Sequence, residues 1–310
     1  PDMSHVEAVV RQLVNIVPDN ALVILESTSP VGTTRKMAEQ FAAAGREIGS
    51  VSFAYCPERV LPGNIIHELK HNTRIVGGLD EIASERASAI YKQIVSGSVL
   101  TCAAEVAEMC KLVENSYRDI NIAFANELSM ICHSMNIDIQ QLIKLANFHP
   151  RVNILEPGIG VGGHCIPIDP WFIASRFPHD TKMIQSARSV NAAKTEWIKG
   201  RIVDEIESFK KQHLRNPNVA LFGLAYKPNV ADLRESPALE IAKAITTLYP
   251  NVICVEPLAK ANLEVKLTPE DVAIEDLDLA IILVAHDNFK SLLTPQTANF
   301  AVLDLCGCFQ

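Results

Sequence analysis

The first hundred residues alternate between two patterns of apolar positions. Apolar residues three and four apart predict helices, and short apolar runs between them predict strands. The helices are expected at His5–Val17, Thr33–Ala44 and Leu79–Ile94. The strands are expected at Ala21–Glu26, Val51–Tyr55, Thr73–Val76 and Ser98–Cys102. Strands separated by helices favour a parallel sheet, so this part of the chain is predicted to be α/β.

Beyond residue 103 the pattern changes twice. Residues 104–200 are predicted to be almost entirely helical, and the long segment Glu105–Asn147 has apolar residues on two faces, so we expect it to lie buried between partners. From residue 216 strands alternate with helices again. These strands are expected at Asn218–Phe222, Val252–Val255, Leu279–Val284 and Ala301–Leu305. The pattern predicts three domains, at residues 1–103, 104–215 and 216–310.

The composition narrows the class of protein. A formal net charge of −8 leaves no basic footprint for nucleic acid, and no apolar run reaches the ~18 residues of a membrane span. The eight cysteines are scattered in apolar surroundings, as thiols are in a reducing cytoplasm. Cys306 and Cys308 could form a metal or redox pair, but no second Cys or His pair lies near them. We therefore expect a cytoplasmic enzyme without a metal.

The segment Pro157–Pro170, PGIGVGGHCIPIDP, holds the most informative pattern in the chain. Several glycines lead to Cys165, and Asp169 follows it four positions later. Glycines let the backbone pass close to a ligand, so a cysteine at the end of such a loop can reach a substrate as a nucleophile. The alternative is a buried structural cysteine after a flexible loop, since free cysteine is among the most buried residue types.

Two other segments place polar side chains where catalysis could use them. In the helical segment around KLVEN, Lys111, Asn115 and Arg118 share one face. Such a stripe is commonly a solvated face, but this one lies in a long and otherwise apolar segment. Glu58 and Arg59 directly follow a short apolar run that is typical of a strand, and strand ends often carry catalytic groups in α/β folds.

Five segments together resemble the family of nucleotide-sugar 6-dehydrogenases, which act on UDP-glucose or UDP-N-acetylhexosamines. They are ESTSPVGTT (Glu26–Thr34), AYCPERVLPG (Ala54–Gly63), AEMCKLVENSYRDINIAFANELS (Ala107–Ser129), HPRVNILEPGIGVGGHCIPIDPWF (His149–Phe172) and FGLAYKPNVADLRESPA (Phe222–Ala238). They occur in the family's order along nearly the whole chain. The resemblance implies an incomplete Rossmann-like NAD-binding part, a central long-helix dimerisation region and a C-terminal Rossmann-like UDP-binding domain.

The resemblance implies a four-electron oxidation of the sugar C6 alcohol to a carboxylate, with NAD as the cofactor. Cys165 would attack the intermediate aldehyde, and the thiohemiacetal would be oxidised to a thioester that water hydrolyses. Lys111 and Asn115 would donate hydrogen bonds to the developing oxyanion. Asp169 is a candidate base or holder of water, and Glu58 is a candidate for activating the hydrolytic water.

The resemblance also implies binding residues around a substrate that carries two phosphates. Those expected at the nucleotide-sugar site are Arg59, Val60, Arg118, His149, Arg151, Gly162, Tyr226 and Lys227. Arg151 would reach the site of the neighbouring subunit in a homodimer. Thr28 and Arg234 match residues that contact the cofactor. Each cation taken alone is typical of a solvated surface charge, which is the commoner state.

Two positions depart from the family pattern. Ile168 stands where the UDP-glucose enzymes usually have a lysine before the aspartate, which indicates the N-acetylhexosamine branch. Cys306 stands where the family often has a basic residue that contacts the nucleotide. The resemblance implies oxidation of UDP-N-acetyl-D-mannosamine to UDP-N-acetyl-D-mannosaminuronate, with another UDP-sugar 6-dehydrogenase as the alternative, and it leaves the C2 epimer open. One nucleotide contact is expected to be altered at Cys306.

The segment that usually holds the cofactor pyrophosphate, a strand followed by a GxGxxG turn, is not found in this sequence. The chain as given is therefore expected to lack the first half of its cofactor domain and to be inactive on its own. Two other classes fit part of the pattern. A non-catalytic UDP-sugar-binding or assembly module would not need Cys165, Lys111 and Asp169 together. A cysteine-dependent acyl or aldehyde enzyme would not need the C-terminal unit.

Overall fold

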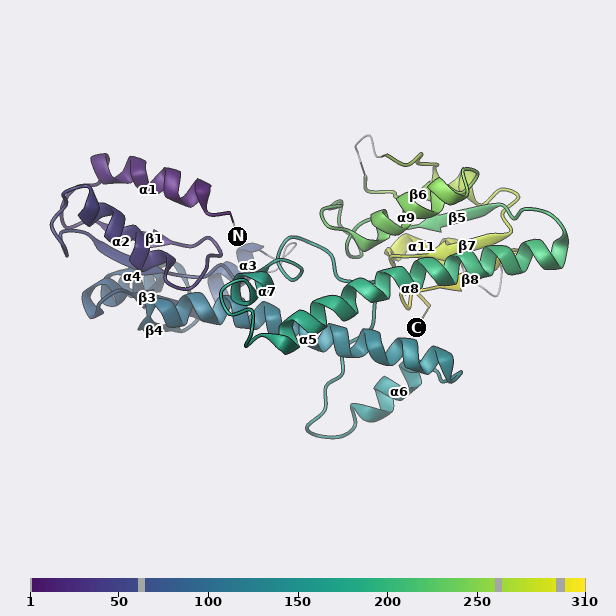
Figure 1. Ribbon diagram of the computed structural model, residues 1–310, viewed down its shortest axis with the longest axis horizontal. Coiled ribbons are helices and arrows are strands. Elements are labelled where there is room, and N and C mark those ends of the chain that lie inside the picture. Colours follow the sequence, from purple (N-terminus) through teal and green to yellow (C-terminus); the bar gives the residue numbers. More distant parts are fainter. Residues whose placement is uncertain (1, 61–64, 260–263, 294–298, 310) are drawn as a thin grey trace. The chain divides into compact units, whose positions relative to one another are not determined.

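The computed structural model describes residues 2–60, 65–259, 264–293 and 299–309 (Figure 1). The chain divides into two compact units. Unit 1 consists of Pro1–Ser116 and Asp169–Thr181, and unit 2 consists of Tyr117–Ile168 and Lys182–Gln310. Helix α5 (Ala104–Ser134) begins in unit 1 and ends in unit 2. The three domains expected from the sequence remain a prediction.

Unit 1 is built on a four-stranded sheet in the order β1-β2-β3-β4. Its strands are β1 (Leu22–Leu25), β2 (Ser52–Tyr55), β3 (Arg74–Gly78) and β4 (Val99–Ala103). β1 pairs with β2 and β3 pairs with β4 in parallel, but β3 runs antiparallel to β2, with Tyr55 opposite Gly77. The prediction of a fully parallel sheet is therefore wrong at this pair. Antiparallel neighbours need no long crossover, and the helix described between them, α3 (Ile65–His71), is short.

Helices cover both faces of this sheet. They are α1 (Ser4–Ile16), α2 (Thr33–Ala43), α4 (Glu81–Ile94) and the first turns of α5. On one face α2 packs against β2, where the Phe41 and Phe53 rings meet edge to face with their centroids 5.0 Å apart. On the other face α4 places Tyr91 in a cluster with Ala54 and Val76. Because strand side chains alternate between faces, burial on both sides explains the continuous apolar runs.

Unit 2 contains a second four-stranded sheet, in the order β6-β5-β7-β8, in which every pair is parallel. Its strands are β5 (Val219–Phe222), β6 (Ile253–Val255), β7 (Leu279–Ile282) and β8 (Ala301–Asp304). They confirm the four predicted strands to within two residues at each end. β5 lies between β6 and β7, so the order reverses there. In open α/β sheets, ligands bind beyond the carboxyl ends of the strands at such a switch point.

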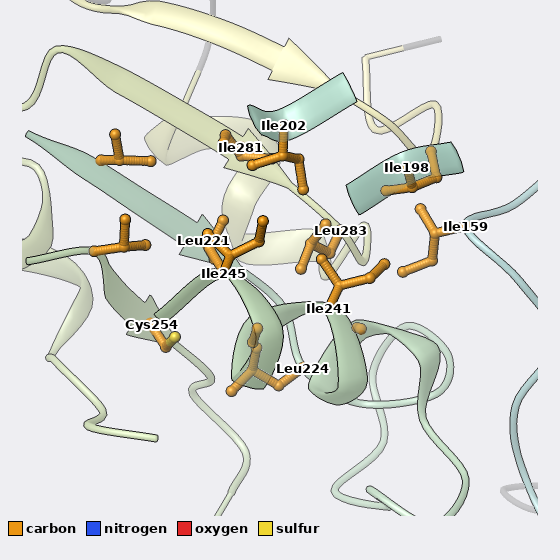
Figure 2. Packing of buried hydrophobic residues seen from close by; sticks show 14 of the residues in the cluster. Ile159, Ile198, Ile202, Leu221, Leu224, Ile241, Ile245, Cys254, Ile281 and Leu283 are labelled. Atoms are coloured by element: carbon orange, nitrogen blue, oxygen red, sulfur yellow. The ribbon is translucent and has the colours of Figure 1, made fainter. Parts of the chain in front are cut away.

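Two apolar clusters sandwich the second sheet. The helices involved are α8 (Lys182–His213), α9 (Pro237–Leu248), α10 (Glu270–Ala273) and α11 (Asp287–Leu292). Leu221 points to the face covered by α8 and α9, whereas Phe222 points to the face covered by α10 and α11. Figure 2 shows Ile202 of α8 and Ile241 of α9 gathered beside the strand residue Leu221. The alternation of neighbouring strand residues thus builds both halves of the core.

The segment expected to run unbroken from Glu105 to Asn147 is two helices, because α5 ends at Ser134 and α6 (Ile139–Ala146) follows after a turn. Asn136 has a φ of 55°, a left-handed conformation that asparagine tolerates. The Asp138 side chain then accepts hydrogen bonds from the first amides of α6. The expectation of one unbroken helical segment is therefore wrong. Asn136 ends the first helix and Asp138 caps the second, and these local signals outweigh the continued helical spacing of apolar residues.

Candidate active site

Asp169 and Asn115 form the centre of the polar group that unit 1 contributes. Asp169 begins α7 (Asp169–Ala174), and its Oδ2 accepts a hydrogen bond from Asn115 Nδ2 of α5 at 2.5 Å. Both side chains are buried. Lys111 lies one turn earlier on α5, is half-buried, and has no hydrogen-bond or ion-pair partner among the described residues. A half-buried cation without a carboxylate is suited to stabilising negative charge that develops on a substrate.

Tyr55 is a neighbour of this group that sequence reasoning missed. Its side chain is 0% exposed, and its hydroxyl has no hydrogen-bond partner among the described residues. Burial, followed by the charges of Glu108 and Asp169, raises the pKa of Tyr55. The phenol therefore keeps its proton, so it is a buried donor within electrostatic range of Asp169.

Glu58 and Arg59, at the end of β2, are held by groups of unit 1. Glu58 Oε1 accepts hydrogen bonds from the amides of Arg59 at 2.6 Å and Val60 at 2.8 Å. Its Oε2 lies 3.6 Å from the guanidinium of Arg74, which is itself buried. Arg59 forms an ion pair with Glu114 of α5 at 2.7 Å. The substrate and catalytic roles expected for these residues remain predictions.

The loop after β1 carries the cofactor contact expected in unit 1. Thr28 lies there half-buried, and its hydroxyl has no partner among the described residues. A side chain of the protein already caps the amino end of α2, because the amides of Gly32 and Thr34 donate to the Glu108 carboxylate at 2.5 and 2.8 Å. A free hydroxyl beyond the carboxyl end of a strand fits a dinucleotide, whereas this capped helix offers no phosphate site.

Close packing within unit 2 explains the glycines that precede Cys165. A Cβ on Gly162 would lie 2.7 Å from both the Glu235 carbonyl oxygen and Pro237 Cδ, so no larger residue fits. Gly163 has a φ of 86°, a conformation that residues with a Cβ rarely adopt. The glycines therefore let the loop approach the start of α9, and Cys165 at its end is half-buried. Contact of Gly162 with the substrate remains a prediction.

A buried polar network anchors the start of the same loop. The Gly158 amide donates to Asn126 Oδ1 at 2.8 Å, and Asn126 Nδ2 donates to Asn191 Oδ1 at 2.8 Å. Asn191 donates to Asp119, which also pairs with Arg188 at 2.6 Å. Sequence reasoning missed these residues because a single polar residue on a long helix is typical of a solvated face.

A pocket of about 190 Å³ lies at the switch point of the second sheet. It is lined by the loops after β5 and β7, the start of α9 and residues 158–160. Two predicted substrate residues, Tyr226 and Lys227, line it, with Lys227 Nζ 5.6 Å from the centroid of the Tyr226 ring. Helix α9 begins here with Ser236 as its cap. A helix amino end together with a lysine suits a phosphate.

Two buried residues hold the loop after β5 in position. Glu256 Oε2 accepts the amides of Leu224 at 2.7 Å and Ala225 at 2.9 Å. His286 Nδ1 accepts the Asn229 amide at 3.0 Å, so Nε2 carries the proton and donates to Glu256 at 3.1 Å. Burial alone would raise the pKa of Glu256, but the bonds from His286 and Leu224 lower it. This pair therefore fixes the segment that carries Lys227.

Arg234 lies in the same unit as the cysteine loop and pairs with Asp232. Arg234 Nη2 is 2.6 Å from Asp232 Oδ2, and this bonding raises the pKa of Arg234 and lowers the pKa of Asp232 to about 2. Cys165 also contributes to the raised pKa of Arg234, so the guanidinium is within electrostatic range of the sulfur. A nearby cation favours the thiolate, which is the nucleophilic form. A cofactor contact by Arg234 remains a prediction.

Three other predicted substrate residues lie on the surface of unit 2. Arg118 on α5, and His149 and Arg151 after α6, are exposed. Asn147 closes the loop that carries the last two, because its Nδ2 donates to the Ile154 carbonyl at 3.0 Å and its Oδ1 accepts the Ile154 amide at 2.7 Å. Contact of these three residues with the substrate, and of Arg151 with a second subunit, remains a prediction.

The loop after β8 carries Cys306, which lines the switch-point pocket. Asp304 holds this loop by accepting the amides of Cys306 at 3.1 Å and Gly307 at 2.9 Å.

Within the described ranges, no three His, Cys, Asp or Glu side chains gather as ligands for a metal ion. No helix in those ranges combines the length and the apolar character that a bilayer crossing requires.

The order of domains matches one family throughout. Residues 1–95 match the NAD binding domain, residues 105–193 the central domain and residues 220–310 the UDP binding domain of the UDP-glucose/GDP-mannose dehydrogenase family. The chain belongs to this family of NAD-dependent nucleotide-sugar dehydrogenases, and NAD is its cofactor.

Relatives within the family are similar over the whole chain. The UDP-N-acetyl-D-mannosamine dehydrogenases of Salmonella typhi and Escherichia coli (strain K12) are 45% and 44% identical to it, over 100% of this chain and 78% of each relative. The NDP-N-acetyl-D-galactosaminuronic acid dehydrogenase of Ralstonia nicotianae is 42% identical, over 99% of this chain and 75% of the relative.

Solved structures show the same fold. The UDP-D-ManNAc dehydrogenase of Pyrococcus horikoshii gives a TM-score of 0.85 at 34% identity, over 99% of this chain and 78% of that chain. The UDP-N-acetyl-mannosamine dehydrogenase Cap5O of Staphylococcus aureus gives 0.84 at 34% identity, over 99% and 77%. The predicted α/β fold with an NAD-binding part and a UDP-binding part is thus confirmed. The expectation that the chain is inactive has no support in these comparisons.

Proposed function

We propose that the chain oxidises UDP-N-acetyl-D-mannosamine at C6 to UDP-N-acetyl-D-mannosaminuronate through a thioester on Cys165. The main support for the proposal is the buried hydrogen bond between Asn115 and Asp169. Lys111, which has no ion-pair partner among the described residues, lies one turn away on α5. Asp169 follows Cys165 by four residues, so the same short segment supplies a nucleophile and a carboxylate. The choice of sugar is supported by the names of relatives at 45% and 44% identity.

The reaction balances as two oxidations and one hydrolysis. The C6 alcohol loses a hydride and a proton and becomes an aldehyde. The Cys165 sulfur adds to the aldehyde carbon and gives a thiohemiacetal, and loss of a second hydride and proton leaves a thioester. Water cleaves the thioester to the carboxylate and the free thiol. When bound, NAD+ would supply the hydride acceptor for each oxidation.

Different side chains of this chain have different roles in the proposed reaction. Lys111 stabilises the oxygen that becomes negative, first as the alkoxide and then as the tetrahedral oxyanion. Asn115 holds Asp169 so that its carboxylate can take a proton from the substrate or from water. Arg234 favours the thiolate of Cys165. Glu58, fixed by its two amide donors, orients the hydrolytic water.

The nucleotide part of the substrate fits the switch-point pocket in unit 2. Lys227 and the amino end of α9 face a diphosphate there, and Tyr226 forms an adjoining wall. Arg118 and His149 supply further positive charge from the surface. Thr28 contacts the cofactor in unit 1, where its hydroxyl is free of described partners.

The active form is proposed to be a homodimer. Along α5, large apolar side chains recur at intervals of four and seven residues, which places them on one face. They are Val106, Val113, Tyr117, Phe124 and Ile131, and each is between 46% and 67% exposed. A second copy of α5 would cover them, and the exposed Arg151 would then serve the neighbouring subunit's site.

The proposed compartment is the cytoplasm. The eight cysteines are all free thiols, and several of them are buried in the two cores. Free thiols in this number are typical of proteins in a reducing compartment.

Rates with a panel of sugars test the proposal. We expect kcat/KM for UDP-N-acetylmannosamine to exceed that for UDP-glucose by about a hundredfold or more, because missing acetamido contacts leave polar groups unpaired. UDP-N-acetylgalactosamine is the second candidate, since one relative at 42% identity is named for the N-acetylgalactosaminuronic acid product. Equal kcat/KM for UDP-N-acetylmannosamine and UDP-glucose would contradict the proposal.

The cysteine is tested separately. Cys165→Ser should abolish uronate formation, because a serine hydroxyl is a far weaker nucleophile than a thiolate. Cys132→Ser, in the buried part of α5, is the matched control and should retain it. Normal uronate yield from Cys165→Ser would rule out the thioester.

A further inference from the structure

A second pocket of unit 2, of about 220 Å³, contains basic side chains that the proposed mechanism leaves unused. It lies between α8, the start of α6, residues 157–158 and the loop after β8. Lys194 Nζ and Arg201 Cζ lie 4.1 and 5.2 Å from the centroid of the Trp197 ring. The His133 ring meets the same indole edge to face at 5.2 Å. Two cations and an imidazole thus converge around one aromatic side chain.

Neither of the two cations has an ion-pair partner among the described residues. Lys194 is only 4% exposed, and its Nζ donates a hydrogen bond to the Ser129 hydroxyl at 2.6 Å. Of the two acidic residues in the pocket, Asp138 caps α6 and Asp304 accepts the amides of its own loop. Buried ammonium groups are normally paired with an anion, whereas no described carboxylate lies within ion-pair distance of the buried Lys194.

The pKa values of the two cations are both lowered. Burial, followed by repulsion from Arg201, lowers the pKa of Lys194 to about 8. Burial also lowers the pKa of Arg201, against a smaller opposing effect of Glu205. An anion bound between Lys194 and Arg201 would relieve both effects.

This pocket adjoins the switch-point pocket, because Gly158 and Cys306 line both. Lys227 lines the switch-point pocket and Lys194 lines this second pocket, so the two lysines flank the wall that both pockets share. Cys306 itself brings no charge to the wall that the two pockets share.

We propose that Lys194, assisted by Arg201, binds a phosphate group of a nucleoside diphosphate where the pocket extends past Cys306. The proposal rests on the proposed function, since it concerns the same nucleotide. It adds a positive contact from α8.

Calorimetric titration with UDP, uridine and inorganic pyrophosphate tests the proposal. Lys194→Met should bind UDP and pyrophosphate about tenfold or more weakly than wild type, because a hydrogen bond to a charged group is lost. It should bind uridine within twofold of wild type. Lys194→Arg keeps the charge and should restore most of the UDP affinity. The matched control is Lys199→Met on the same helix, whose lysine already pairs with Glu196 and Glu240, and it should bind all three ligands like wild type.

Several results would overturn the proposal. They are UDP affinity of Lys194→Met within twofold of wild type, an equal loss of affinity for uridine, and equal losses in Lys199→Met. Thermal unfolding without ligand separates binding from folding, since Lys194→Met should melt no lower than wild type if the buried charge is uncompensated. If wild type binds pyrophosphate through Lys194 but does not bind UDP, the anion site stands and the proposed function fails. If wild type binds neither, both fail.

Discussion

Lys111 and Lys194 are both withdrawn from solvent, and no described carboxylate forms an ion pair with either. Lys111 lies one turn from Asn115 in unit 1, whereas Lys194 lies over Trp197 in unit 2. Withdrawing a cation from water costs free energy that a carboxylate usually offsets. Each position therefore indicates a negative group on a ligand, the reacting oxygen for Lys111 and a phosphate for Lys194.

Replacing Lys111 should affect the chemical step more than binding. In Lys111→Met we expect kcat to fall by about 10²–10³-fold with little change in KM, because the lost interaction develops as charge forms on the substrate oxygen. Steady-state kinetics with UDP-N-acetylmannosamine measure this. Lys92→Met, at the exposed end of α4, is the control and should retain wild-type rates. A kcat within threefold of wild type in Lys111→Met would remove this lysine from the mechanism.

Lys194 should also give stability a defined pH dependence. Its pKa in the folded chain is lowered to about 8 from an ordinary 10.5, so between these values the unfolded chain binds more protons than the folded one. Below pH 8 the buried charged lysine lowers the free energy of unfolding. As pH rises toward 10.5 this loss should disappear, so the free energy of unfolding should increase by on the order of 3 kcal/mol. Denaturant unfolding of wild type and Lys194→Met across this range isolates the effect. A pH-independent difference between the two would refute it.

Some residues of the candidate site could be predicted from the sequence, and others could not. Cys165 and Asp169 stand out because a glycine-rich loop is visible as a local pattern. Tyr55, Glu256 and Lys194 each lie in ordinary strand or helix sequence. Their importance comes from neighbours distant along the chain, such as the amides of residues 224 and 225 for Glu256. No local pattern encodes such contacts, so these roles emerge only from the folded structure.

At the scale of elements, the loop after β5 is the part of the switch-point pocket that most hydrogen bonds hold in place. Two backbone amides of this loop donate hydrogen bonds to Glu256, which lies in the segment after β6. His286, in the segment after β7, accepts a third amide of the loop and donates to Glu256. Because the three segments meet beyond the carboxyl ends of neighbouring strands, the position of Lys227 depends on all of them.

Glu256→Gln should loosen this loop. A neutral amide can accept fewer hydrogen bonds and would turn an NH2 group toward backbone donors, so we expect a loss of about 2–3 kcal/mol in the free energy of unfolding. KM for the UDP-sugar should rise about tenfold while kcat changes less, because the loop positions the nucleotide. Glu264→Gln serves as the control, since its side chain is 78% exposed in a surface ion pair with Lys243. Unchanged KM and stability in Glu256→Gln would contradict this account.

Elements were predictable to different degrees for physical reasons. The middle strands of the two sheets, β2, β3, β5 and β7, are mostly buried, and the apolar runs of such strands mark them clearly. The direction of β3 was not predictable, because pairing direction depends on how the connection returns and not on the strand's own residues. The break between α5 and α6 was also overlooked, although Asn136 and Asp138 carry turn and cap signals.

At the scale of the whole molecule, the exposed apolar face of α5 should be an interface between two copies of the chain. Sedimentation velocity at micromolar concentration should show a dimer for wild type. Phe124→Lys should give a monomer, because a charge placed in an apolar interface has to be desolvated. Leu214→Lys is the control, since Leu214 is 91% exposed beyond the end of α8. A monomeric wild type, or a Phe124→Lys dimer of unchanged affinity, would contradict the dimer.

The central claim is a four-electron oxidation by this family member, and the stoichiometry of cofactor reduction tests it most directly. The purified chain is incubated with a limiting, known amount of UDP-N-acetylmannosamine and excess NAD+, and NADH and uronate are quantified at completion. Two NADH and one uronate are expected for each sugar nucleotide consumed. One NADH per sugar nucleotide with aldehyde as the product, or no NADH at all, would contradict it.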